Sequence, residues 1–210
     1  MKRTEFKSFA TSLFLFVISV LLCSCSQAQE TKPVERIPTG KKALIVYLSR
    51  TKNTKAVAQI IHGNVGGNFV ELELQNPYPE NYQQIVAQVA KENEQGILPV
   101  LKTKIDGIEN YDTIFIGFPT WGMQLPPPIK SFLTQNNLKG KTIIPFNTNA
   151  GYGIGSSFDK LKELSPNSKV LEGFSIKGGV ERDGILFVME GEKKIEVVKK
   201  VKEWLRSLGY

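Results

Sequence analysis

The sequence predicts an α/β fold in which helices cover both faces of a five-stranded, doubly wound parallel sheet, giving three layers. Apolar runs of strand length alternate along the chain with segments of helical periodicity. The runs are short and nearly continuous, which is typical of parallel strands buried on both faces. The predicted strands are residues 43–48, 68–74, 111–118, 141–146 and 170–176.

Helical patterns fill most of the gaps between these strands. One helix begins near Asn53, and another spans residues 81–95. The second helix is expected to turn four residues inward: Tyr82, Ile85, Val86 and Val89. A run of three prolines precedes a further helix, because proline suits a first turn. The last helix is expected to turn its lysines to solvent. Its buried face is predicted to contain Ile195, Val198, Val201, Trp204 and Leu205.

The turn after the first strand has the composition of a phosphate site. It contains Ser49, Arg50, Thr51, Lys52, Asn53 and Thr54. Free backbone N–H groups at a helix N-terminus attract phosphate, and hydroxyl groups add donors. The glycine patterns of nucleoside-triphosphate and dinucleotide loops are missing from this turn, which favours a phosphate monoester on a smaller cofactor. Capping of the helix without a ligand is an equal alternative, since Ser, Thr and Asn are ordinary N-caps.

Two further strands end in loops that could contact the same ligand. The third strand is followed by Pro119, Thr120, Trp121 and Gly122. The fourth is followed by a polar, glycine-rich loop that contains Asn147, Thr148, Asn149, Gly151, Tyr152 and Gly153. Ligands of open parallel sheets bind at the carboxyl ends of the strands. Trp121 could instead be a core residue, but its place at a strand end favours ring stacking.

These three segments resemble the flavodoxin-like family, which binds flavin mononucleotide (FMN), over about residues 42–208. The resemblance implies a strand order of 2-1-3-4-5 and a helix that starts within residues 155–161. It also implies that Ser49, Thr51, Asn53 and Thr54 hold the phosphate and that Trp121 stacks on the isoalloxazine ring. Residues 147–153 would donate backbone hydrogen bonds to the polar edge of the flavin.

One position departs from the family pattern, which usually reads Ser/Thr-x-Thr-Gly-Asn-Thr. Lys52 stands where the family has glycine. If that position requires a positive φ, a lysine is strained there. Alternatively, its charge compensates by lying near the phosphate.

The resemblance implies an FMN-dependent electron carrier or oxidoreductase that transfers electrons or hydride through the flavin. Its partner would be a redox protein or a small-molecule electron acceptor. The alternative is a flavin-free binding protein of the cell surface that retains the fold, which Lys52 and export both favour. The polar segment 178–184 is interpreted as a plain surface loop in preference to one that overhangs the cofactor.

The first 41 residues are predicted to target the protein to the cell envelope. Residues 1–25 read as a bacterial lipoprotein-type signal peptide, with basic residues before an apolar stretch at 13–22. Lipidation at Cys25 is preferred to ordinary cleavage after Ala28. Residues 26–41 read as a flexible tether, and residues 42–210 form the flavodoxin-like domain. We therefore expect an exported protein of the periplasm or cell envelope, anchored to the membrane by its lipid.

Composition narrows the chemistry of the domain. Both cysteines lie in the leader, so disulfides and thiol catalysis are not expected in the domain. His62 is the only histidine and lies near a helix end, where it would act as a mild cap; no metal site or catalytic residue is predicted. The net charge of +7 could favour binding to an anionic membrane or an acidic partner, or it could be an ordinary surface charge that indicates no partner. No basic-aromatic motif supports nucleic-acid binding.

Overall fold

The computed structural model of the protein describes residues 42–210. The predicted signal peptide, tether and lipidation site at Cys25 lie outside the described residues. Within residues 42–210, no helix is both long enough and apolar enough to cross a membrane.

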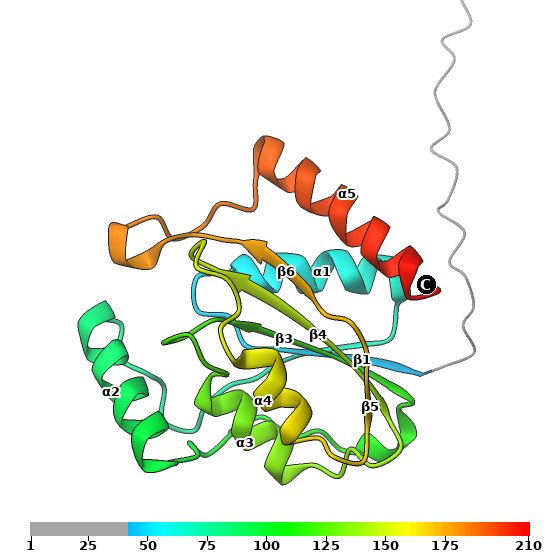
Figure 1. Ribbon diagram of the computed structural model, residues 1–210, viewed down its shortest axis with the longest axis horizontal. Helices are drawn as coiled ribbons and strands as arrows, with labels where there is room; N and C mark the ends of the chain where they lie inside the picture. Colours follow the sequence, from blue (N-terminus) through cyan, green and yellow to red (C-terminus); the bar gives the residue numbers. More distant parts are fainter. Residues whose placement is uncertain (1–41) are drawn as a thin grey trace, which may run out of the picture. The chain divides into compact units, whose positions relative to one another are not determined.

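The described chain alternates strands and helices around a parallel sheet (Figure 1). The strands are β1 (Ala43–Tyr47), β2 (Asn68–Glu71), β3 (Thr113–Pro119), β4 (Thr142–Asn149), β5 (Lys169–Val170) and β6 (Phe174–Lys177). The α-helices are α1 (Asn53–Val65), α2 (Tyr82–Gln95), α3 (Pro127–Gln135), α4 (Ser157–Glu163) and α5 (Gly191–Ser207). Two short 3-10 helices, η1 (Ile108–Asn110) and η2 (Glu181–Asp183), complete the set.

The strand order is β2-β1-β3-β4-β5, which confirms the predicted fold class and topology. All strand pairings are parallel. The single fifth strand predicted at residues 170–176 is wrong in one respect, because the chain forms two short strands there. Both β5 and β6 pair with β4, β5 near its start and β6 near its end. Residues 171–173 interrupt the ladder, so β5 and β6 share the position of one broken edge strand.

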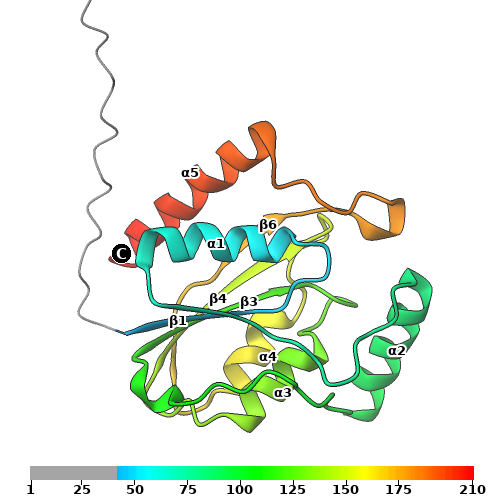
Figure 2. The same ribbon diagram turned by 180° about the vertical axis from the view of Figure 1, so that it is seen from behind.

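Alternate residues of the buried strands point into two separate cores. On one face, Ile45 and Tyr47 pack with side chains of α1 and α5. On the other face, Leu44 and Val46 pack with side chains of α3 and α4. Figures 1 and 2 show these helix pairs on opposite sides of the sheet. This is the burial on both faces that the continuous apolar runs predict.

The helix α2 is placed differently from the other helices. Its Asn81 N-cap accepts a hydrogen bond from the Gln84 N–H at 3.1 Å, so the helix starts where the sequence predicts. Ile85 and Val89 are buried, yet neither belongs to either core. Both ribbon views show α2 standing at the end of the sheet toward which β3, β4 and β6 point. We call this edge, where the parallel strands end, the carboxyl rim.

Two predicted inward positions are wrong. Val86 of α2 is 45% exposed, because α2 covers the carboxyl rim with only part of its apolar face. Ile195 of α5 is 72% exposed, and Val197 is buried in its place. Val197, Val201 and Leu205 recur every four residues and so form one stripe along α5.

Candidate cofactor site

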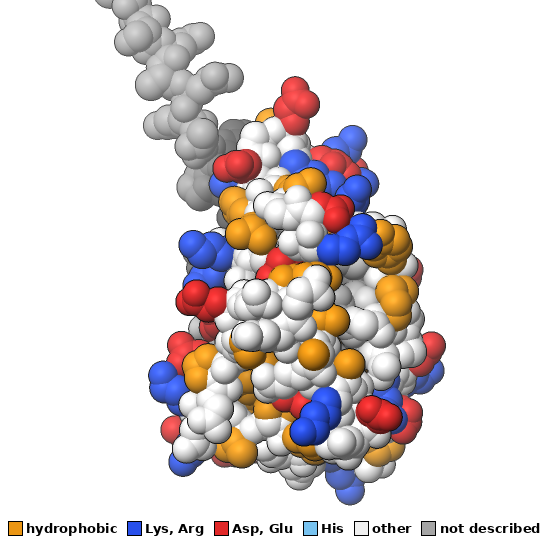
Figure 3. Space-filling view, turned by 90° about the vertical axis from the view of Figure 1, so that its left-hand side faces the viewer, with side chains coloured by type: hydrophobic (Ala, Val, Ile, Leu, Met, Phe, Trp, Pro, Cys, Tyr) orange, Lys and Arg blue, Asp and Glu red, His pale blue; other side chains and the backbone are white. Residues whose placement is uncertain are grey.

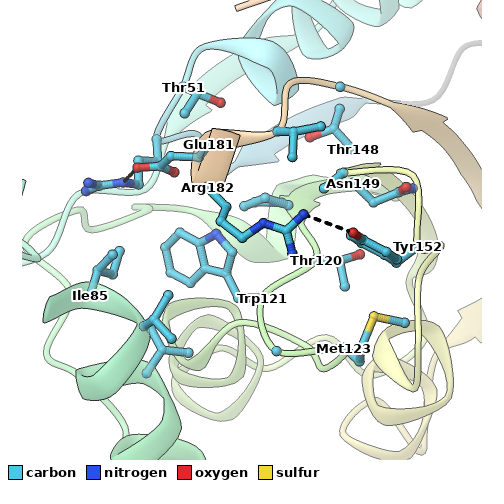
Figure 4. Close-up of a pocket in the computed structure, with 18 of the residues that line it drawn as sticks. Thr51, Ile85, Thr120, Trp121, Met123, Thr148, Asn149, Tyr152, Glu181 and Arg182 are labelled. Carbon is cyan, nitrogen blue, oxygen red and sulfur yellow. Dashed lines mark hydrogen bonds and ion pairs between the residues drawn. The ribbon is translucent and has the colours of Figure 1, made fainter. Parts of the chain in front are cut away.

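A cavity of about 580 Å³ opens at the carboxyl rim (Figure 4). Its walls come from the α1 turn, the loops after β3 and β4, the segment after β6, and α2. Figure 3 looks onto this side of the molecule and shows hydrophobic and uncharged surface at its centre, with charged side chains toward the margins. The cavity therefore lies where the strand-end rule places ligands.

The structure brings most of the predicted site residues together around this cavity. Those that line it are Arg50, Thr51, Asn53, Thr54, Pro119, Thr120, Trp121, Gly122, Thr148, Asn149, Tyr152 and Gly153. Four predicted residues do not line it: Ser49, Lys52, Asn147 and Gly151. Thr54 of the first turn of α1, Trp121 of the loop after β3 and Tyr152 of the loop after β4 all line the cavity, so one small molecule there could contact all three.

Arg50 does not present its charge to the cavity. Its Nε donates to Glu181 Oε1 at 2.6 Å, and its Nη1 donates to the Pro79 carbonyl at 2.9 Å. Its Nη2 donates to the Glu80 carbonyl. These bonds use the guanidinium to join the α1 turn to two other segments.

The side chains of the α1 turn also bind within the protein. Asn53 is 3% exposed; its Nδ2 donates to Thr51 Oγ1 at 2.8 Å and to the Leu186 carbonyl at 2.6 Å. Its Oδ1 accepts from the Val188 N–H at 3.1 Å. Thr54 Oγ1 lies 2.9 Å from Thr148 Oγ1. These side chains therefore shape the turn and fasten it to the rest of the carboxyl rim.

The backbone of the turn is what remains available for a ligand. Among the described residues, none accepts a hydrogen bond from the backbone N–H groups of residues 51–54. The next N–H, that of Lys55, donates to Ser49 Oγ at 3.1 Å and so caps the helix. A row of free N–H groups at the positive end of a helix dipole is a binding site for an anion. We call this part of the cavity the phosphate end.

Lys52 has φ 64° and ψ −4°, which is the left-handed region. The position therefore has the positive φ that glycine adopts freely, and lysine is strained there. The Lys52 side chain is exposed and lies outside the cavity lining, so it adds no donor to the cavity. Of the two alternatives drawn from the sequence, strain of the Lys52 backbone is therefore the one that the structure supports, and not a charge placed near the phosphate.

Trp121 forms the aromatic wall of the cavity. It begins a tight turn in which the Gln124 N–H donates to the Trp121 carbonyl at 3.0 Å, with positive φ at Gly122 and Met123. Tyr78 meets the indole edge-on, with ring centroids 5.4 Å apart and an interplanar angle of 86°. Burial, together with the hydrogen bond to Glu92, raises the pKa of Tyr78, so this supporting phenol stays neutral. The indole is therefore held from one side and open to the cavity.

Two asparagines at the end of β4 organise the glycine-rich loop that follows; the sequence placed both in the loop, but β4 continues through Asn149. Asn149 Oδ1 accepts from the Gly151 N–H at 2.8 Å and from the Gly153 N–H at 3.2 Å. Asn147 is fully buried, and its Nδ2 donates to the Phe118 carbonyl and to Thr120 Oγ1, each at 3.0 Å. The N–H groups of the two glycines are thus used within the loop, contrary to the role that the resemblance implied for them.

The segment after β6 also lines the cavity, which makes its interpretation as a plain surface loop wrong. Gly178, Gly179, Val180, Glu181 and Arg182 all belong to the cavity wall. A Cβ at Gly179 would collide with the carbonyl oxygens of Ile185 and Leu186, so glycine permits this tight reversal. Arg182 Nη2 donates to Tyr152 Oη at 3.3 Å, and Figure 4 shows Arg182 reaching from η2 toward Tyr152. Trp121, Tyr152 and Arg182 make up what we call the ring end.

The side wall of the cavity comes from α2, which the sequence did not place near the site. The residues that contribute are Tyr82, Ile85, Val86, Val89, Ala90, Asn93 and Glu94. Most of these side chains are apolar, so α2 gives the cavity a wall that can exclude water from a bound aromatic ring. The exposure of Val86 follows from this position beside the cavity.

The sequence model of the Flavodoxin family matches residues 42–190 of the chain. The chain belongs to the flavodoxin family. This membership and the strand order together confirm the family expected from the three loops, and the expected cofactor, FMN, agrees with it. No curated protein matches the chain.

Several solved structures share this flavodoxin fold. A Bacteroides eggerthii protein provisionally described as a flavoprotein is 28% identical, with a TM-score of 0.66 over 81% of this chain and 99% of its own. A Bacteroides uniformis protein of the same description is 25% identical, with a TM-score of 0.65 over 79% of this chain and 98% of its own. A Lactobacillus acidophilus flavoprotein is 23% identical, with a TM-score of 0.58 over 69% of this chain and 98% of its own.

The residues of this flavodoxin's cavity fit FMN. The free N–H groups of residues 51–54 suit a phosphate monoester, and the open face of Trp121 suits a flat aromatic ring. Thr120 and Asn149 also line the cavity. The cavity size is ordinary for a cofactor site.

Proposed function

We propose that this flavodoxin-family protein binds FMN in the carboxyl-rim cavity and transfers electrons or hydride through it. The observation that carries the proposal is the pairing, within one cavity, of a free N–H row with an open indole face. A solved Lactobacillus acidophilus flavoprotein with the same fold contains FMN, which supports the choice of flavin.

The protein would contribute binding and orientation, while FMN supplies the electron and hydride chemistry when bound. The N–H groups of residues 51–54 would hold the phosphate, and Trp121 would stack on the ring. Ile85 and Val89 of α2 would keep water from one side of the site. The described lining contains neither histidine nor cysteine, and its titratable side chains other than arginine are Tyr82, Glu94, Tyr152 and Glu181.

The test is a titration of the full-length protein with FMN and, separately, with riboflavin, followed by flavin fluorescence. We expect FMN to bind and riboflavin to bind at least about tenfold more weakly, because charge-assisted hydrogen bonds to the phosphate are worth roughly 1.5–3 kcal/mol each. Equal affinity for the two flavins would contradict the role of the turn. Failure to bind either would favour the flavin-free alternative, to which the strained Lys52 lends support.

We also propose that the protein is exported and anchored by a lipid on Cys25, and that it exchanges electrons with a redox protein or a small-molecule acceptor. The sequence of the first 25 residues supports the anchor. Detergent phase partitioning of the protein made in bacteria, compared with the Cys25→Ala variant, tests it. We expect only the variant to enter the aqueous phase, and partition of both into that phase would contradict anchoring.

A further inference from the structure

The charged side chains around the cavity leave one positive group at the ring end. Four charged residues line the cavity: Arg50, Glu94, Glu181 and Arg182. Arg50 and Glu181 neutralise each other at 2.6 Å. Glu94 lies in the last turn of α2. The remaining cation of the lining, Arg182, is hydrogen-bonded to Tyr152 at the ring end.

The backbone that carries Arg182 is fixed to the phosphate end. Glu181, its neighbour, is held by Arg50 at 2.6 Å. The segment that follows η2 is held by Asn53, which binds the Leu186 carbonyl and the Val188 N–H. The Gly178 N–H donates to the Asn149 carbonyl at 2.8 Å. The arginine therefore starts from a defined place on the cavity wall.

The side chain of Arg182, in contrast, is held only by weak, exposed interactions. Its Nε pairs with Asp183 Oδ1 at 2.9 Å, but the two side chains are 57% and 49% exposed. Ion pairs that are this exposed contribute little stability, because solvent competes with them. Asp183 does not line the cavity, whereas Arg182 does. The guanidinium can therefore turn toward a stronger anion inside the cavity.

We propose that Arg182 is the residue that makes this site prefer reduced FMN over oxidised FMN. This inference rests on the proposed function. At neutral pH, fully reduced FMN carries one more negative charge on its ring system than oxidised FMN. A guanidinium beside the ring attracts that charge, and the apolar wall of α2 reduces the screening by solvent. Arginine stays cationic at any pH at which the protein is folded.

The experiment measures the dissociation constants of oxidised and of chemically reduced FMN for the full-length protein and its variants. Removing the charge with Arg182→Gln should weaken binding of reduced FMN by about tenfold and change binding of oxidised FMN by less than about threefold. If the dissociation constant of reduced FMN rises tenfold relative to that of oxidised FMN, the midpoint potential of the two-electron couple of the bound flavin falls by about 30 mV. The control is Arg206→Gln in the exposed last turn of α5, which should change neither constant.

Two further variants separate the charge of Arg182 from its contact with Tyr152. Arg182→Lys keeps the charge and should retain most of the preference. Tyr152→Phe removes the hydrogen bond but no charge and should leave the ratio of the two constants unchanged.

The results divide clearly. The proposal is overturned if Arg182→Gln weakens both forms equally, if Arg182→Lys behaves like Arg182→Gln, or if Tyr152→Phe reproduces the shift. A wild-type protein that binds both forms with the same affinity overturns this proposal and leaves the proposed function standing. A wild-type protein that binds neither form overturns both.

Discussion

At the phosphate end of the cavity the side chains bind one another, whereas at the ring end they face the ligand space. Asn53 and Thr54 are 3% and 2% exposed, and their polar atoms have partners within the protein. Tyr152 is 66% exposed and has a single hydrogen bond, to Arg182. The phosphate end offers a ligand its backbone, and the ring end offers its side chains.

This difference separates stability from selectivity. A backbone site keeps its donors whatever side chains surround it, provided that the turn keeps its shape. The side chains of the phosphate end should therefore act mainly on the free energy of unfolding. Those of the ring end should act mainly on affinity and on redox properties.

The largest effect should come from Asn53→Ala. The change leaves the Val188 N–H and the Leu186 carbonyl without their partner. We expect a loss of about 2–3 kcal/mol in the free energy of unfolding, since the hydrogen bonds of the buried Asn53 side chain are removed. Urea unfolding measures it. The control is Asn64→Ala on the same helix, where a single bond from Nδ2 to the Ile60 carbonyl is lost. The comparison fails if Asn64→Ala is the more damaging of the two.

At the ring end, Trp121→Ala should weaken FMN binding with little effect on stability. Stacking of an aromatic side chain on a base is worth about 1–3 kcal/mol, so we expect a loss of roughly 5- to 150-fold in affinity. The matched control is Trp204→Ala in α5, where the indole packs on Phe115 and Phe174 far from the cavity lining. That variant should lose stability and keep its affinity for FMN. The opposite outcome would remove the distinction between the two ends.

A smaller effect is expected from Lys52→Gly at the phosphate end. The left-handed conformation costs a residue with a side chain roughly 1–2 kcal/mol. Glycine avoids this strain, but it loses more conformational entropy on folding than lysine does, which offsets part of the stabilisation. We therefore expect stability to rise by about 0.5–1 kcal/mol, seen as a higher urea midpoint with an unchanged slope. Lys55→Gly, inside the helix, should destabilise the protein. A fall in stability with Lys52→Gly would show that this lysine is not strained.

The smallest effect concerns pH and the residue behind Trp121. Burial and the hydrogen bond to Glu92 raise the pKa of Tyr78, so the folded protein keeps this proton at a pH where the unfolded chain has lost it. The unfolded state then binds fewer protons, and stability falls as pH rises above about 10. In Tyr78→Phe this fall should be shallower, as measured by urea unfolding across that range. An equally steep fall would assign the effect to other groups, such as Tyr47, whose pKa is also raised by burial.

The sequence predicts three of the loops at the carboxyl rim because each follows a continuous apolar strand. The fourth loop, after β6, was missed because β6 is a short edge strand with alternating burial and the polar residues Ser175 and Lys177. Its signal was the pair Gly178-Gly179 directly after a predicted parallel strand, because ligands of such sheets bind at the carboxyl ends of the strands.

Two other features had no local signal. The periodicity of α2 identifies which side chains are buried but not the surface that buries them, so its place at the carboxyl rim was not predictable. Arg50 and Glu181 are 131 residues apart, and neither has a neighbour in sequence that marks the other. The same holds for Asn53 and Leu186, which are 133 residues apart.

These long-range bonds have a consequence for the order of events during biosynthesis. The first loop of the domain reaches its final shape only when residues near 181–188 are available to pair with it. Contacts between distant parts of a chain form late, because a long loop must close first. A growing chain that ends before this segment lacks a finished binding site, so uptake of the flavin has to follow synthesis of nearly the whole polypeptide.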